Sequence, residues 1–142
     1  MTAREILLTF AAALGSRPSA LRREDGDWRI KGRFGHVYAV PEGYQIYYRG
    51  ADEFEEPTSS QGWTYAKRAM AFAKVTQDGD EEGILLLERL PTADEAEIIR
   101  AKLRIPKRVE YSEEALAQKR EQFLKARDGL TKKSASSDPE AE

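Results

Sequence analysis

Cysteine is absent from the 142-residue sequence, and histidine occurs once, at His36. The chain therefore forms no disulfide and supplies neither a thiolate zinc site nor a cysteine nucleophile. A long apolar run is also missing, because no stretch reaches the roughly 18 residues that a membrane-spanning helix needs. Neither sign of charge dominates, since 23 Lys and Arg stand against 25 Asp and Glu. Any surface that binds an anion must therefore be local.

The N-terminal segment Ile6 to Leu14 is short and apolar, but Glu5 precedes it where a signal peptide carries positive charge. A helix explains more of these residues. Thr2 and Glu5 have the spacing of a capping box, and Gly15 is a typical helix end. One apolar stripe at helical spacing comprises Ala3, Leu7, Phe10 and Leu14. We therefore expect a first helix, no cleaved signal, no membrane association and a cytoplasmic location.

The spacing of the apolar residues then changes from the helical period to the alternation that is typical of a strand. After a polar connection over Ser16 to Asp27, apolar and basic residues alternate from Trp28 to Phe34. His36 to Val40 and Tyr44 to Arg49 are rich in residues that favour strands, and a Pro-Glu-Gly turn separates them. The pattern predicts a three-stranded antiparallel meander.

Helical spacing returns over Trp63 to Val75 and again after the Thr92–Glu95 capping box, where Pro106 ends the helix. Between them, Ile84 to Leu87 is apolar at every position, which is typical of a strand covered on both faces. This strand is therefore expected to be central. A fourth helix is predicted from the cap Ser112 to about Arg127.

The predicted fold class is α+β: an N-terminal helix, a three-stranded antiparallel meander, a helix, a further central strand and two C-terminal helices. We expect one α+β domain over residues 1–127. The dipeptide Asp128–Gly129 is expected to stop the last helix. Residues 128–142 have almost no apolar side chain to bury, so a disordered polar tail is predicted.

The most informative pattern is Arg29, Lys31 and Arg33, because alternation places all three on one face of a strand. Tyr47 and Arg49 alternate likewise on the third strand, and in a suitable register Tyr38 joins them. Cations pair with phosphates and aromatic rings stack on bases, so these residues predict a face that binds DNA or RNA. The alternative is an ordinary polar outer face of a half-buried sheet.

A second basic run lies at the C-terminal end of the helix predicted after Thr92. It comprises Arg100, Lys102, Arg104, Lys107 and Arg108. These cations either contact phosphates or simply stabilise the negative end of the helix dipole, and we favour the second interpretation. If the two basic runs lay together on one side of the molecule, phosphate binding would gain support.

No motif indicates catalysis or a cofactor. His36 is interpreted as a structural histidine, and no glycine-rich phosphate loop is present. The segment Asp78 to Gly83 partly matches the sequence pattern of an EF-hand calcium-binding loop, but Arg89 occupies the position of the last ligand. We therefore expect a non-enzymatic binding module without metal or cofactor.

The alternative function is a protein-interaction or inhibitor module. Its acidic loops, residues 52–56 and 78–82, would steer a basic partner. The apolar stripe of the last helix, formed by Leu116, Phe123 and Leu124, would dock in a groove of that partner.

Overall fold

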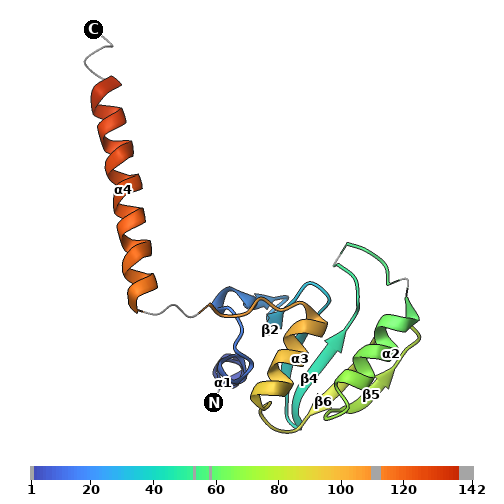
Figure 1. The fold of residues 1–142 in the computed structure, drawn as a ribbon. Coiled ribbons are helices and arrows are strands. Elements are labelled where there is room, and N and C mark those ends of the chain that lie inside the picture. Colours follow the sequence, from blue (N-terminus) through green and yellow to red (C-terminus); the bar gives the residue numbers. More distant parts are fainter. Residues whose placement is uncertain (1, 53, 58, 110–112, 138–142) are drawn as a thin grey trace. The chain divides into compact units, whose positions relative to one another are not determined.

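The computed structural model describes residues 2–52, 54–57, 59–109 and 113–137. The chain divides into two compact units, Met1–Arg108 and Val109–Glu142. Within the described residues, the first unit holds three α-helices and a six-stranded antiparallel sheet, and the second unit holds one helix (Figure 1). The predicted α+β class is confirmed. The single domain expected over residues 1–127 stays a prediction.

The elements of the first unit follow one another along the chain. They are α1 (Ala3–Leu14), a 3-10 turn (Pro18–Ala20), β1 (Leu21–Glu24), β2 (Asp27–Lys31), β3 (Gly35–Val40), β4 (Gly43–Tyr48), α2 (Ser60–Ala69), β5 (Lys74–Asp78), β6 (Gly83–Leu87) and α3 (Ala93–Leu103). The strand order in the sheet is β1-β2-β3-β4-β6-β5, and all neighbours are antiparallel. The predicted meander is therefore present as β2, β3 and β4, within a larger sheet.

Local signals explain where α1 and α3 begin. Thr2 and Glu5 form the predicted capping box of α1, and Thr92 and Glu95 form that of α3. In each box, the Thr and Glu side chains each accept a hydrogen bond from the backbone N–H of the other residue. These N–H groups have no partner within the helix itself. As predicted, α1 ends at Gly15, which adopts the left-handed conformation with φ 69°.

The sequence pattern does not predict either edge strand of the sheet. β1 lies in the segment interpreted as a polar connection, and a tight turn at Asp25 and Gly26, both with positive φ, joins it to β2. β5 begins at Lys74, where a helix was expected to continue to Val75. Every residue of β5 is exposed, so the strand carries no apolar alternation. β5 pairs only with β6, and their register shifts between Val75 and Gln77.

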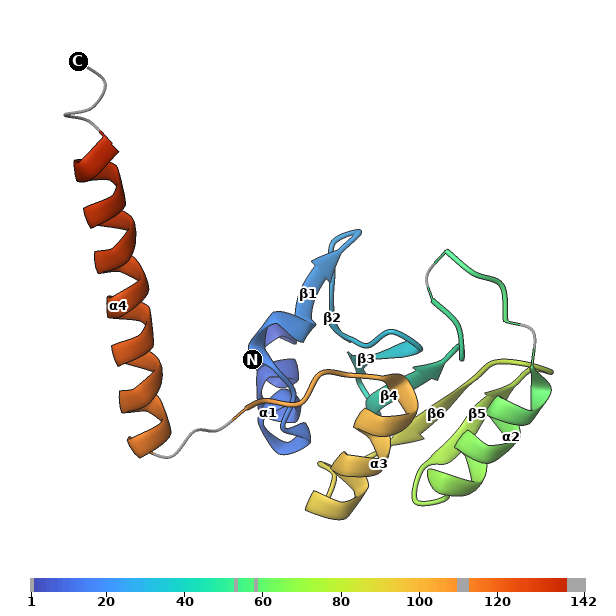
Figure 2. The same cartoon turned by 45° about the horizontal axis from the view of Figure 1, so that its top comes forward.

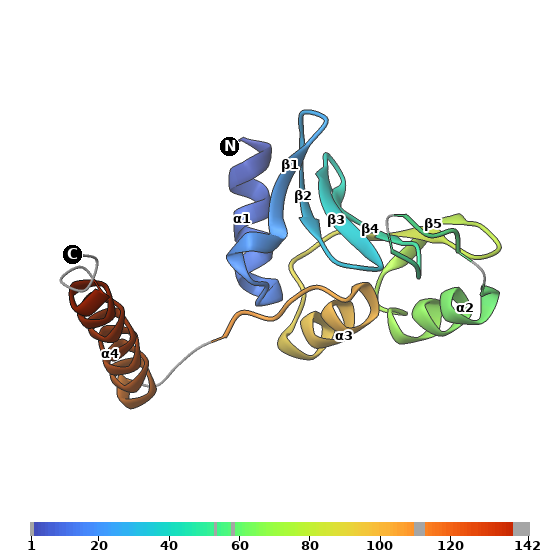
Figure 3. The same ribbon diagram turned by 90° about the horizontal axis from the view of Figure 1, so that it is seen from above.

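One face of the sheet holds the core. Its central row crosses four strands and is fully buried: Ile30, Val37, Ile46 and Leu85. The helices pack on this face with Leu7, Phe10, Leu14, Trp63, Ala66, Met70, Ala96, Ile99 and Leu103. Figures 2 and 3 show α1, α2 and α3 on the same side of the twisted sheet. Among the described residues of the first unit, no helix covers the opposite side, which we call the open face.

This arrangement corrects the prediction for β6. The strand is second from the edge, and helices cover one of its faces only. Leu85 is buried in the core, whereas Ile84 and Leu86 lie half-buried on the open face beside Tyr47 and Gln45 of β4. Apolar residues on both faces therefore reflect large neighbouring side chains in the sheet, and not a second layer of helices.

The second unit contains α4 (Glu113–Ser137). The helix continues through Asp128 and Gly129, so the predicted helix end there is wrong. One glycine costs a helix only about 1 kcal/mol, which the flanking helical residues tolerate. The predicted cap Ser112 and residues 138–142 lie outside the described residues, and the disorder predicted for those last residues stays a prediction. None of the helices in the described ranges has the length and apolar character needed to cross a membrane.

Candidate functional site

Three of the five residues predicted to form the first site lie on the open face. Arg29 and Lys31 come from β2, and Tyr47 comes from β4. The register places Lys31, His36 and Tyr47 in one row across three strands. Tyr38 and Gln45 face each other two pairs further along β3 and β4, on the same face of the sheet. The alternation of β2 therefore predicted the shared face of Arg29 and Lys31 correctly.

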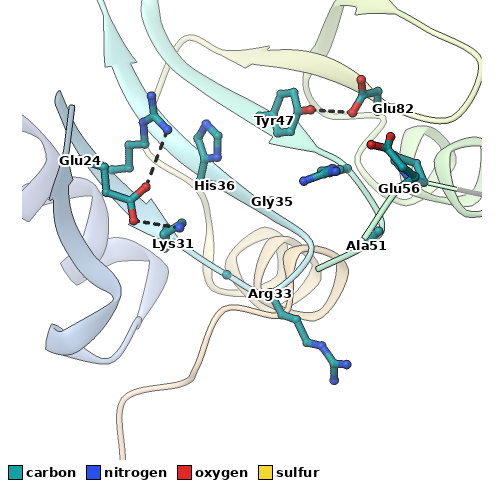
Figure 4. A pocket seen from close by; sticks show the side chains of 13 residues that line it. Glu24, Lys31, Arg33, Gly35, His36, Tyr47, Ala51, Glu56 and Glu82 are labelled. Carbon is teal, nitrogen blue, oxygen red and sulfur yellow. Dashed lines mark hydrogen bonds and ion pairs between the residues drawn. The ribbon is translucent and has the colours of Figure 1, made fainter. Parts of the chain in front are cut away.

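Arg33 does not share this face, which corrects the sequence prediction. β2 ends at Lys31, and the chain then turns toward the end of α3. A Cβ at Gly32 would lie 2.2 Å from the carbonyl oxygen of Leu103, so only glycine permits this approach. The Arg33 guanidinium points away from the open face (Figure 4), and its Nε donates to Asp52 Oδ1 at 2.7 Å.

A pocket of about 360 Å³ opens on this side of the sheet. Its lining includes the cations Arg29, Lys31, Arg33 and Arg49, the rings of His36 and Tyr47, and the carboxylates Glu24, Glu56 and Glu82 (Figure 4). Arg49 follows β4 and donates from Nη2 to the Glu55 carbonyl at 2.5 Å. The volume is within the range of pockets that hold small ligands.

Three aromatic rings, those of His36, Tyr38 and Tyr47, lie close together on the open face, and we call them the ring platform. The rings of His36 and Tyr47 stack with centroids 5.0 Å apart and planes 16° apart. The ring of Tyr38, two residues further along β3, has its centroid 5.7 Å from that of His36, with planes 43° apart. The Tyr47 hydroxyl donates to Glu82 Oε2 at 2.6 Å, and the Tyr38 hydroxyl donates to the Gln45 side-chain oxygen. Hydrogen bonds at the phenol ends therefore fix the orientation of two of the three rings.

Glu24 on β1 partly neutralises the cations of β2. Its Oε1 lies 2.8 Å from Lys31 Nζ, and its Oε2 lies 4.0 Å from an Arg29 nitrogen. The hydrogen bond from Lys31 lowers the pKa of Glu24, so this carboxylate is charged at neutral pH. The side chains of Arg29 and Lys31 remain 28% and 20% exposed, which leaves both cations within reach of a ligand.

The two stacked rings are uncharged at neutral pH. Burial, with a further contribution from the nearby charges of Arg29 and Lys31, lowers the pKa of His36 to about 4. Burial also raises the pKa of Tyr47 to about 12, and its hydrogen bond to Glu82 acts in the same direction. The pocket therefore combines neutral aromatic surface with fixed positive and negative charges.

The second basic run is divided by the structure. Arg100 and Lys102 lie in the last turn of α3, as expected for cations at the negative end of a helix. Backbone contacts tie Lys107 and Arg108 to Ser16 and Gly15 after α1. Arg104 differs, because its guanidinium carbon lies 5.3 Å from the centroid of the Phe34 ring.

Phe34 joins the two basic runs. The guanidinium carbon of Arg33 lies 5.8 Å from the same ring centroid that Arg104 contacts. The sequence alone leaves such a meeting open without predicting it, because about 70 residues separate the two arginines. His36 was also missed as a site residue, although its alternation with Tyr38 on β3 was a usable signal.

The described residues contain no group of three or more His, Asp or Glu side chains placed to hold a metal ion. Comparison with known protein families, curated proteins and solved structures finds no match to this chain. A function must therefore be argued from the site's own chemistry.

Proposed function

We propose that this protein is a non-enzymatic module that binds single-stranded DNA or RNA on the open face of its sheet. The observation that carries the proposal is the ring platform of His36, Tyr38 and Tyr47 on the face that the helices leave uncovered, with Arg29 and Lys31 beside it. Sheet faces of this composition suit unpaired bases, because every base offers a flat surface for stacking.

The division of roles follows from the charges. The neutral rings of His36 and Tyr47 accept stacked bases without placing a charge beneath them. Arg29, Lys31 and Arg49 supply positive charge for the phosphates that connect those bases. A duplex hides the faces of its bases, so the platform favours single strands.

The carboxylates on the pocket wall restrict what binds. A phosphate at Lys31 must share or displace the contact with Glu24, which lowers affinity for phosphate alone. A ligand that also stacks on the rings compensates for this loss. The site therefore favours a nucleotide chain over a simple anion.

The proposal is tested by fluorescence anisotropy with labelled oligo(dT) and oligo(U) at several salt concentrations. Arg29→Glu with Lys31→Glu is expected to abolish binding, while Arg68→Glu, an exposed cation on α2, is expected to leave it intact. Wild-type binding is expected to weaken with salt by a slope of about −0.7 per contacted phosphate.

The ring platform is tested in the same assay with a matched pair at Tyr47. Tyr47→Phe keeps the ring and is expected to bind as wild type, whereas Tyr47→Leu is expected to lose about 1–3 kcal/mol of binding energy. Absence of oligonucleotide binding, or binding that salt does not weaken, would reject the proposal.

A protein-interaction module is the second candidate. It is supported by the exposed side chains of Leu116, Phe123 and Leu124 on α4, of which Phe123 is 69% exposed. The acidic loops give it less support, because Asp52 pairs with Arg33 and Asp78 pairs with Lys67 within the first unit. This candidate predicts that removal of residues 109–142 abolishes binding to a partner protein. Nucleic-acid binding is expected to be retained.

A further inference from the structure

We infer that the bound strand leaves the open face and continues into a second pocket at Arg104 and Phe54, so that the protein requires a chain longer than the ring platform alone holds. This inference rests on the proposed function. Sheet platforms of this kind stack about two or three bases. The second pocket would receive the nucleotides that follow.

The second pocket adjoins the first. Its volume is about 450 Å³, and Lys31, Gly32 and Arg33 line both pockets. Arg22, Phe54 and Arg104 add two cations and an aromatic ring that the first pocket lacks. The shared residues form a continuous wall from the platform to Arg104.

The cations of the second pocket are held in place by the backbone. The Arg33 N–H donates to the Arg104 carbonyl at 3.1 Å, and the Phe34 N–H donates to the Leu103 carbonyl at 2.9 Å. These two bonds fasten the β2–β3 loop to the end of α3. The Phe34 ring lies against both guanidinium groups, and Asp52 holds that of Arg33 as well, so little conformational freedom remains for a ligand to restrict.

The backbone at Arg104 is itself unusual. Arg104 follows the last turn of α3 with φ 57° and ψ 45°, a left-handed conformation that favours glycine at this position. A long side chain at a strained position points to a role for that side chain. In the proposed path, the Arg104 guanidinium contacts a phosphate from the pocket wall, where the Phe34 ring holds it.

Phe54 supplies a surface for stacking. Its side chain is 95% exposed, so it contributes almost nothing to the core. It lines the pocket from the loop whose Asp52 pairs with Arg33. The Arg33 side chain is nevertheless 65% exposed, which leaves it accessible to a phosphate beside Asp52.

The test compares labelled oligonucleotides of three and eight nucleotides, in DNA and RNA forms, with the full-length protein. Arg104→Gly and Phe54→Ala are each expected to lower affinity for the eight-mer by about five-fold or more, with little effect on the three-mer. Arg68→Ala serves as the control for loss of one positive charge outside both pockets. Because glycine suits the backbone at residue 104, the melting temperature of Arg104→Gly should be unchanged or higher, which separates lost binding from lost structure.

Three outcomes are informative. Selective loss of eight-mer affinity in both variants supports the second pocket, and the DNA and RNA arms show which sugar it prefers. Wild-type affinity of both variants for the eight-mer, with binding still lost in Arg29→Glu with Lys31→Glu, overturns the second pocket and leaves the proposed function standing. No binding of either oligonucleotide to the wild-type protein rejects both.

Discussion

The imidazole of His36 contacts the rings of both Tyr38 and Tyr47 and lies close to two cations. Its pKa of about 4 in the folded protein is well below the ordinary value of 6.5. Between these two values the unfolded chain binds a proton that the folded protein does not. The free energy of unfolding therefore falls as the pH drops from about 6.5 to about 4, and this contribution is fully present above pH 6.5.

We expect His36→Phe to remove this part of the pH dependence. The wild-type protein should lose about 2 kcal/mol more stability than the variant across that window, allowing for the partial exposure of the ring. Urea unfolding at several pH values measures the difference. Tyr38→Phe keeps the titrating group and should retain the wild-type slope, and equal slopes for wild type and His36→Phe would contradict the assignment. Carboxylates with lowered pKa, such as Glu24, titrate in all three proteins and cancel.

Among the elements, α2 packs on the sheet with Trp63 and Ala66, and Trp63 makes a particularly close contact. Trp63 is 1% exposed and packs over Gly83 at the start of β6, while its indole Nε1 donates to Asp78 Oδ1 at 2.7 Å. A Cβ at Gly83 would lie 2.1 Å from the Trp63 ring and 2.5 Å from the Gln77 carbonyl oxygen. The position of α2 therefore depends on a glycine at residue 83, because any larger residue would collide with Trp63.

Gly83→Ala is expected to lower the free energy of unfolding by about 2–3 kcal/mol, because neither the buried ring nor the neighbouring backbone can move freely. Gly26→Ala is the control. Nothing lies within 4 Å of a Cβ there, and only the positive φ is unfavourable, so a loss of about 1 kcal/mol is expected. Urea denaturation measures both variants, and equal losses would show that the contact with Trp63 is unimportant.

The elements also show what the sequence was able to predict. Caps and apolar stripes located α1 and α3, because those signals act within one turn of helix. The sequence did not predict β1 and β5, because edge strands need no alternation of apolar residues. In the site, alternation placed Arg29 and Lys31 together but failed at Arg33, where the close approach of Gly32 to Leu103 ends the strand. No local pattern encodes the meeting of Arg33 and Arg104 on Phe34.

At the scale of the whole molecule, the core belongs to one unit. Among the described residues, the hydrophobic cluster lies entirely before residue 106, from Leu7 to Ile105. The described side chains of α4 from residue 114 to residue 127 are exposed, apart from the half-buried Ala115. The chemistry proposed for nucleic acid and the exposed apolar side chains of α4 therefore occupy separate parts of the chain.

A chain that ends at Arg108 is expected to unfold cooperatively, with a melting temperature within a few degrees of the full-length protein, and to bind oligonucleotides with similar affinity. Thermal unfolding followed by circular dichroism, together with the anisotropy assay, measures both properties. A chain that ends at Arg100 loses Leu103 and Ile105 from the core and should not fold. Loss of cooperative unfolding in the chain ending at Arg108 would show that the first unit depends on α4.

The register shift in β5 has a consequence for how the protein behaves at high concentration. A straight, exposed edge strand offers its free N–H and C=O groups to the edge of another copy and so promotes aggregation. The irregularity between Val75 and Gln77 interrupts that row of groups, and Lys74 adds a charge at the same edge. At the opposite edge, β1 has four residues, of which Arg22 and Arg23 are charged and exposed. Both edge strands thus carry features that disfavour pairing with another copy, whereas no helix among the described residues of the first unit covers the open face.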